Sequence, residues 1–104
     1  MSLASGAMAI LVDAPRWPRH GTTFAHLVSD ASSAELHAFA ERVGTGLGRP
    51  LRFHHDHYDV PAAAWDMVVS AGARVVTTHE IVRALRAAGL RATAARPLRT
   101  RQCR

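Results

Sequence analysis

The sequence predicts one small α/β domain, built from a short, largely parallel or mixed sheet and about three helices. Short apolar runs such as residues 9–12 alternate along the chain with stretches of helical hydrophobic period. Alternation of strands and helices is typical of α/β folds, in which polar sites gather at the carboxyl ends of strands. The length of 104 residues suits a single domain and is too short for two.

Four short strands are expected. The apolar run 9–12 is bounded by Asp13 and a proline, as is typical of a buried strand with a polar residue at its carboxyl end. The other strands are expected at 24–29, 51–53 and 74–77. Between the first two, the segment from Pro15 to Gly21 contains two prolines and a glycine and is therefore predicted to be a loop. The side chains of Trp17 and Trp65 are expected to anchor the core.

Three helices are expected from their start and stop signals. Ser32 and Glu35 have the spacing of a capping box, and Gly44 is predicted to end the helix that they begin. Pro61 is predicted to be the first residue of the second helix, where its missing N–H costs nothing. Residues 77–80 hold a second capping box, which begins the third helix.

The net charge of +5 is concentrated at one end of the chain. Residues 91–104 contain five arginines and no acidic residue, whereas the rest of the chain has equal numbers of basic and acidic residues. We therefore expect an α/β domain over residues 8–90 and a basic disordered tail over residues 91–104. Such a tail could make weak contact with nucleic acid, or it could reflect coding bias, because every basic residue is arginine. Residues 1–7 are expected to be a non-native or disordered leader.

The cysteine content and the hydropathy pattern indicate the cellular compartment of the protein. Cys103 is the single cysteine, so no disulfide can form within the chain. The apolar run near the start is short and lacks a basic leading segment, which fits neither an export signal nor a membrane span. These features predict a cytoplasmic protein without a membrane partner. Because a core of this size gives little excess stability, a homodimer is expected.

The densest polar cluster covers residues 54–59, immediately before Pro61. Alternation along an extended strand would divide it into two sets, His55, His57 and Asp59 on one side and His54, Asp56 and Tyr58 on the other. Imidazole and carboxylate groups are common ligands of divalent metals. The chain contains no H-E-x-x-H motif, no paired C-x-x-C motif and no phosphate-binding glycine-rich motif, so this spacing suggests a metal site without identifying one.

Several polar segments resemble a known family. The strand ending in Asp13 and the segments 26–30, 35–40 and 57–60 are similar to the short bacterial and phage proteins grouped as domain of unknown function four thousand and thirty-one. The resemblance covers residues 8 to about 90. It implies no reaction, since that family has no established activity. It does imply that the chain shares the family's recurrent polar positions, which here are Asp13, His26, Asp30, His37, His57, Tyr58 and Asp59.

These residues lead to a first hypothesis, a metal-assisted hydrolase that prefers phosphoester substrates. A divalent ion, Zn, Mn or Mg, would activate a bound water, and a nearby side chain would shuttle the proton. The expected catalytic residues are His57 and Tyr58. The expected metal ligands are Asp13, His26, Asp30, His37 and Asp59.

Two alternative hypotheses give these residues no catalytic role. The chain could be a binding module with a structural His/Asp network and an arginine-rich tail for nucleic acid, or a homodimeric scaffold. Asp30 and Asp59 each precede an expected helix start, where the helix dipole stabilises a carboxylate. His37 lies at the edge of the apolar stripe of its helix and could be an ordinary boundary residue. Whether the chain is an enzyme therefore stays open at this point.

Overall fold

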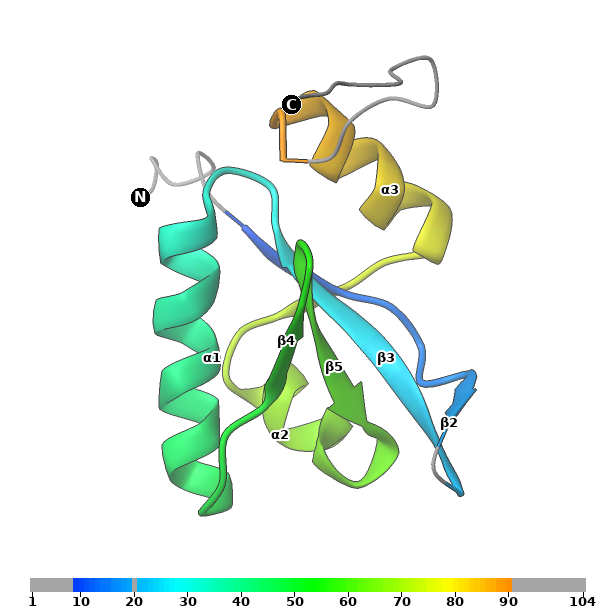
Figure 1. The fold of residues 1–104 in the computed structure, drawn as a ribbon, viewed down its shortest axis with the longest axis vertical. Coiled ribbons are helices and arrows are strands. Elements are labelled where there is room, and N and C mark those ends of the chain that lie inside the picture. The colour runs from blue at the N-terminus through cyan, green and yellow to red at the C-terminus, as the bar shows by residue number, and fades with distance from the viewer. Residues whose placement is uncertain (1–8, 20, 91–104) are drawn as a thin grey trace, which may run out of the picture.

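A computed structural model describes residues 9–19 and 21–90. The expected leader 1–7 and the expected basic tail 91–104, with Cys103, lie outside the described residues. Within them the chain forms a sheet and three α-helices (Figure 1). The strands are β1 (Ile10–Val12), β2 (Trp17–Arg19), β3 (Thr22–Ser29), β4 (Arg52–His54), β5 (His57–Pro61) and β6 (Arg74–Val75). The helices are α1 (Ser33–Leu47), a 3-10 turn η2 (Ala62–Ala64), α2 (Trp65–Ser70) and α3 (Thr78–Ala87).

The predicted α/β class is confirmed, and the sheet is mixed. The strand order is β4-β5-β3-β1-β6, and β2 also pairs with β3. Strands β1 and β6 pair in parallel, whereas the other pairs are antiparallel. The eight-residue strand β3 pairs with three neighbours and is the centre of the sheet.

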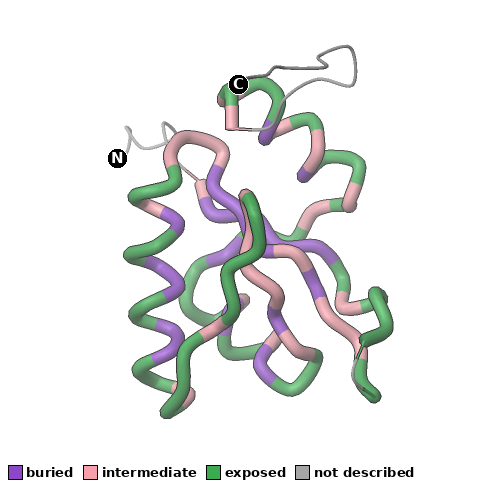
Figure 2. Tube along the Cα trace, in the orientation of Figure 1, coloured by how far each residue is buried: buried purple, intermediate pink, exposed green. Residues whose placement is uncertain are grey.

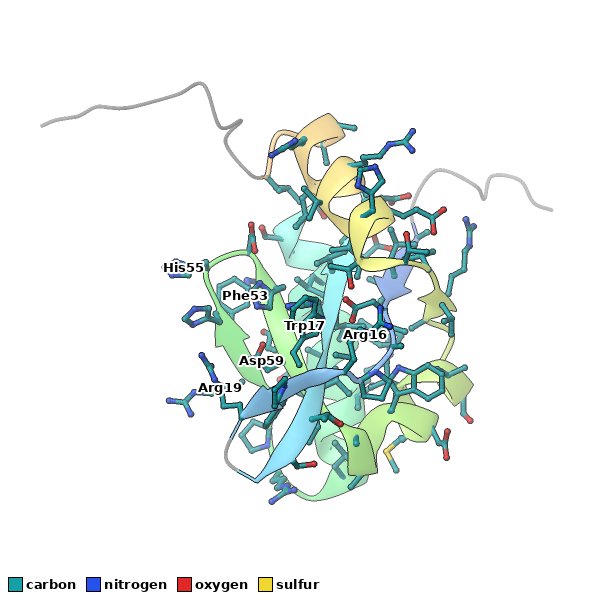
Figure 3. All side chains as sticks on the ribbon, turned by 90° about the vertical axis from the view of Figure 1, so that its right-hand side faces the viewer. Arg16, Trp17, Arg19, Phe53, His55 and Asp59 are labelled. Carbon is teal, nitrogen blue, oxygen red and sulfur yellow. The ribbon has the colours of Figure 1, made fainter. Side chains whose placement is uncertain are left out.

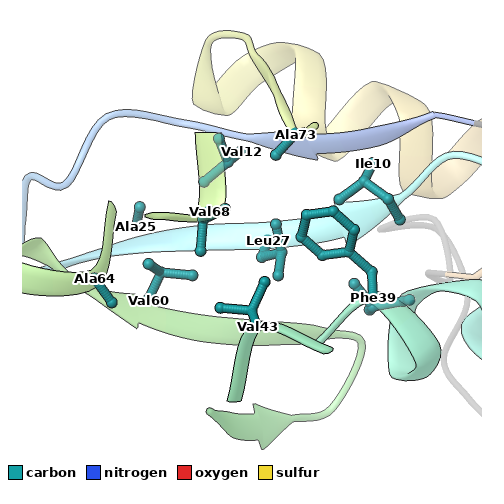
Figure 4. Close-up of a cluster of buried hydrophobic side chains, with 11 residues drawn as sticks. Ile10, Val12, Ala25, Leu27, Phe39, Val43, Val60, Ala64, Val68 and Ala73 are labelled. Atoms are coloured by element: carbon teal, nitrogen blue, oxygen red, sulfur yellow. The ribbon is translucent and has the colours of Figure 1, made fainter. Parts of the chain in front are cut away.

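The two faces of the sheet are covered unequally. One face packs against α1 and α2 in the main core, where Leu27, Val60 and Val68 are fully buried (Figure 4). The opposite face packs against α3 through a smaller cluster that comprises Leu11, Val28, Ile81 and Leu85. Figure 1 shows α3 near one end of β3, whereas β2 lies at the other end. Part of the second face is thus left without a covering helix among the described residues.

Strand β2 corrects the prediction of a loop between the first two long strands. Pro18 cannot donate a hydrogen bond to a neighbouring strand, but a proline is tolerated in a strand that has one side unpaired. Among the described strands, β2 pairs with β3 alone, in the register Trp17 to Phe24 and Arg19 to Thr22. The Trp17 side chain is not the core anchor that we expected, since the residue is 44% exposed.

Helix α1 also corrects a prediction, because it continues through Gly44 and ends at Gly48, whose φ is 82°. Gly44 is buried, and a Cβ added there would lie 3.1 Å from the Cα of Pro50. The glycine thus serves the close approach of the following loop rather than the end of the helix. Buried and exposed residues alternate along α1 (Figure 2), in agreement with the predicted apolar stripe.

The starts of the helices agree with the sequence in part. Thr77 and Glu80 form a complete capping box at α3. At α1, Ser32 accepts a hydrogen bond from the backbone of Glu35, but the Glu35 side chain turns to Ser29 instead of closing the box. Pro61 is not the first residue of a helix, since it ends β5 and precedes η2. None of the helices in the described part of the chain is long and apolar enough to span a membrane.

Truncation of the main core should destabilise the protein. Leu27 lies in β3 and is fully buried, so we expect Leu27→Ala to lower the free energy of unfolding by about 2–5 kcal/mol. Met67 on α2 is 40% exposed, and Met67→Ala should cost far less. Urea unfolding followed by circular dichroism measures both. Equal losses in the two variants would contradict this description of the core.

Candidate functional site

Strand pairing aligns the polar residues of the partly uncovered sheet face. His26 of β3 stands opposite Asp59 of β5, and Asp59 stands opposite Arg52 of β4. His57, two residues before Asp59, pairs with His54. Residues that are two apart on a strand point to the same face, so these side chains share the face on which Val28 packs against α3.

Asp13 is the buried centre of this arrangement. It follows β1 directly, and its side chain is held from two elements. The Oδ1 atom accepts the backbone N–H of His26 at 2.6 Å, and Oδ2 lies 2.8 Å from His26 Nδ1. Oδ2 also accepts the hydroxyl of Thr78, the first residue of α3, at 2.6 Å. The exposed fraction of Asp13 is 0%, so the carboxylate exchanges water for these protein donors.

These donors decide the charge of Asp13. Burial acts to raise the pKa of the carboxyl group, but the hydrogen bonds from His26 and Thr78 outweigh it and hold the pKa below the ordinary value of 3.8. Asp13 is therefore a carboxylate at neutral pH. Its backbone carbonyl also accepts the indole N–H of Trp65 at 2.8 Å, which ties α2 to the same position.

His26 presents one bonded and one available ring nitrogen. A carboxylate can only accept a hydrogen bond, so the neutral ring carries its proton on Nδ1 and leaves the lone pair on Nε2. Among the described residues no hydrogen-bond partner of Nε2 is found. The side chain is 25% exposed and lines a pocket of about 350 Å³. His26 thus combines a nitrogen fixed by Asp13 with a second nitrogen that has no partner within the described part of the chain, on a ring that borders the pocket.

His57 lies beside His26 with a T-shaped ring contact, at a centroid distance of 4.9 Å. Its Nδ1 lies 2.9 Å from Asp56 Oδ1, and its Nε2 lies 3.3 Å from Asp59 Oδ1. Both ring nitrogens of His57 therefore lie next to a carboxylate oxygen. His26 and His57 also line a hollow of about 60 Å³ beneath α3, which is large enough for a water molecule.

The wall of the larger pocket combines aromatic and cationic groups. The Trp17 ring lies 5.4 Å from that of His26, and Arg19 Nη1 lies 3.8 Å from Asp59 Oδ2. Figure 3 shows Trp17, Arg19 and Asp59 on the side of the molecule that carries β2 and the open part of the sheet. Phe24 and His54 complete this part of the lining.

Two of the predicted site residues lie together on the opposite face of the sheet. The hydroxyl of Tyr58 lies 2.6 Å from His37 Nδ1, and the Phe53 ring packs against both residues. Burial and the nearby carboxylate of Glu41 raise the pKa of Tyr58 above 10.0, so the neutral phenol shares a hydrogen bond with the imidazole. Because Tyr58 and His57 are adjacent on one strand, they point to opposite faces, and Tyr58 does not reach the His26 pocket.

The remaining predicted residues have local roles. Asp30 Oδ1 accepts the backbone N–H of Ala9 at 2.8 Å, at the opposite end of β3 from the pocket. The expected alternation over 54–59 is interrupted by a turn at residues 55 and 56, where His55 has a φ of 62°. His54 therefore joins His57 on one face, contrary to the division that an unbroken strand would give.

The five expected metal ligands do not form one constellation. Asp13, His26 and Asp59 lie on the site face, whereas His37 lies on the opposite face and Asp30 at the far end of β3. Within residues 9–19 and 21–90, no group of three or more His, Cys, Asp and Glu side chains is arranged to hold a metal ion. The expected divalent metal, homodimer and cytoplasmic location stay predictions.

Three contributors to this site were not predicted from the sequence. Thr78 and Trp65 bond Asp13 from positions 65 and 52 residues away, which no local pattern reveals. Arg19 belongs to a segment that was predicted to be a loop. The one available signal was Pro18 flanked by Trp17 and Arg19, which is compatible with an edge strand.

The comparisons with known proteins give a family and no activity. Residues 10–88 match the family described as "Protein of unknown function (DUF4031)", the same family that the sequence resembled. No curated protein and no solved structure gives a significant match.

The bonding of Asp13 predicts a pH dependence of stability. A carboxyl group whose pKa is lowered by folding contributes stability that is present above its unfolded pKa, about 3.9, and is lost as the pH falls through its folded pKa. We expect Asp13→Asn to cost about 1–3 kcal/mol at pH 7, because His26 and Thr78 lose a charged acceptor. Urea unfolding at several pH values should show this difference shrinking below about pH 4.

Asp66 provides a matched control, since it is exposed on α2. Asp66→Asn should stay close to the unsubstituted protein at every pH. A cost of Asp13→Asn that is the same at pH 7 and pH 3 would show that the Asp13 charge does not stabilise the fold.

Proposed function

Since the chain belongs to the DUF4031 family, whose description names no activity, we propose its function from the site itself: a hydrolase of phosphoester substrates. The proposal rests mainly on one observation. Asp13 is fully buried and holds His26 Nδ1, while the His26 ring borders a pocket and its Nε2 has no hydrogen-bond partner among the described residues. A carboxylate that orients an imidazole in this way is the arrangement of a general base in many hydrolases.

The reaction follows from the two imidazoles. His26 Nε2 takes a proton from a water molecule, and the water oxygen attacks the phosphorus of the bound ester. The bond between phosphorus and the leaving oxygen breaks, and the Nε2–H of His57, whose nitrogen lies 3.3 Å from Asp59 Oδ1 in the free site, turns to that oxygen and gives it a proton. The products are a phosphate and an alcohol. Proton transfer from His26 to His57, directly or through solvent, restores the starting state.

The charges around the pocket support a phosphoester as the substrate. Arg19 is more than half exposed at the pocket wall and contacts Asp59 only at 3.8 Å, so its guanidinium is accessible to an anion. Arginine matches the geometry of phosphate oxygens and stabilises the charge that develops on them during transfer. Trp17 and Phe24 supply apolar surface for the organic part of the ester.

Loss of the base should abolish turnover. We expect His26→Asn to lower kcat/KM for bis(p-nitrophenyl) phosphate or p-nitrophenyl phosphate by about 10²–10⁴-fold. Release of nitrophenol measures the rate. His79→Asn removes an exposed imidazole of α3 and should leave the rate unchanged. The pH–rate profile should be bell-shaped, because the base acts unprotonated and the acid protonated.

The same assay separates the histidine route from the metal-assisted route that the sequence led us to expect. Activity that persists in EDTA, and is not raised by Zn²⁺, Mn²⁺ or Mg²⁺, supports acid–base catalysis by His26 and His57. Activity that appears only with an added ion would replace that mechanism by the metal-assisted one. Absence of turnover under all these conditions, or equal turnover by His26→Asn, would refute the proposed hydrolase.

A further inference from the structure

A second pocket adjoins the candidate site and carries an excess of positive charge. It has a volume of about 360 Å³ and shares Arg19, Phe24 and Asp59 with the His26 pocket. Two further arginines, Arg49 and Arg52, line it, and Asp59 is the one acidic residue among its described lining residues. We refer to Arg19, Arg49 and Arg52 below as the arginine cluster.

The arginine cluster is assembled from three separate parts of the chain. Arg19 ends β2, Arg52 begins β4, and Arg49 lies in the loop after α1. All three residues are exposed, and the contact of Arg19 with Asp59 is the one ion pair found for the cluster among the described residues. One carboxylate cannot neutralise three guanidinium groups, so this end of the site attracts anions.

The aromatic groups lie beside this charge. Trp17 is 44% exposed and packs with a tilted ring against His26, and Phe24 lies opposite Trp17 in the strand register. Phe24 lines both pockets and thus connects the catalytic end to the cationic end. Cationic grooves combined with aromatic surfaces on which bases stack are the features by which proteins bind single-stranded nucleic acids.

We propose that the substrate of the His26 site is a single-stranded nucleic acid. One of its phosphodiesters lies at His26, a base stacks on Trp17, and a neighbouring phosphate binds to the arginine cluster. This inference rests on the proposed hydrolase, because it names the substrate class of the same site. A single small phosphoester would occupy the His26 pocket alone, whereas the adjoining cationic pocket provides for a further phosphate of the same strand.

Binding can be measured separately from turnover. We suggest the 104-residue chain with His26→Asn as the background and a fluorescein-labelled oligothymidylate as the probe, with fluorescence anisotropy recorded over a series of salt concentrations. The arginines at 91–104 are present in every variant, so their contribution to binding is the same throughout. Circular dichroism verifies that each variant is folded.

The double substitution Arg49→Gln and Arg52→Gln should weaken binding at low salt. It should also reduce the slope of log Kd against log salt by about 0.7 for each phosphate that the variant no longer neutralises. Trp17→Ala should weaken binding about tenfold with an unchanged slope, because stacking releases no counterions. The matched control, Arg83→Gln with Arg86→Gln, removes two arginines of α3 that lie outside both pockets. It should change the affinity and the salt slope less than the double substitution in the arginine cluster does.

Equal affinities and slopes for the pocket double variant and the α3 double variant would overturn the inference, since binding would then depend on general charge. Tighter binding of a duplex than of the single strand would overturn it as well. If the protein hydrolyses the nitrophenyl ester but the pocket double variant binds the oligonucleotide as tightly as its background does, the nucleic-acid substrate is refuted and the proposed hydrolase stands. If the protein with His26 intact shows no turnover, but the pocket double variant binds the oligonucleotide more weakly than the α3 double variant does, the arginine cluster is supported as a binding site and the hydrolase is refuted.

Discussion

The structure depends on one buried negative charge. The carboxylate of Asp13 is removed from water and must be compensated by protein donors, which come from the backbone and side chain of His26 and from Thr78. Through these bonds a single side chain joins the end of β1 to the middle of β3 and to the start of α3. The backbone of the same residue holds Trp65 and thereby α2. The orientation of the His26 imidazole is therefore part of the packing of the domain.

The uneven covering of the sheet explains why polar residues occur in its central strands. Helix α3 packs on Leu11 and Val28 near one end of the second face, and the described helices leave the face beyond it open. His26 and His57 lie at the border between α3 and that open part, and Asp59 lies beside His57, so these side chains reach the pocket or one another. On the other face the same strands carry Leu27 and Val60, which the main core requires. The site is thus formed by the residues of β3 and β5 that point away from the main core.

Local signals in the sequence predicted local structure well. The capping box of Thr77 and Glu80 was predicted because its two partners are three residues apart. The shared face of His57 and Asp59 followed from strand alternation. The other features of the site depend on contacts between distant parts of the chain. His37 and Tyr58 are separated from His26 because α1 packs on the opposite face of the sheet. Thr78 contacts Asp13 because of where α3 begins. Strand β2 was missed because its pairing with β3 overrides the unfavourable Pro18.

Gly44 connects the packing of α1 to the charge of the second pocket. Its missing side chain lets the chain fold back so closely that the carbonyl oxygen of Arg49 would lie 3.2 Å from an added Cβ. A methyl group at this position would therefore require the backbone of residues 49–50 to shift by a few tenths of an ångström. The position of the Arg49 backbone beside the second pocket thus depends on the absence of a side chain at one position of α1.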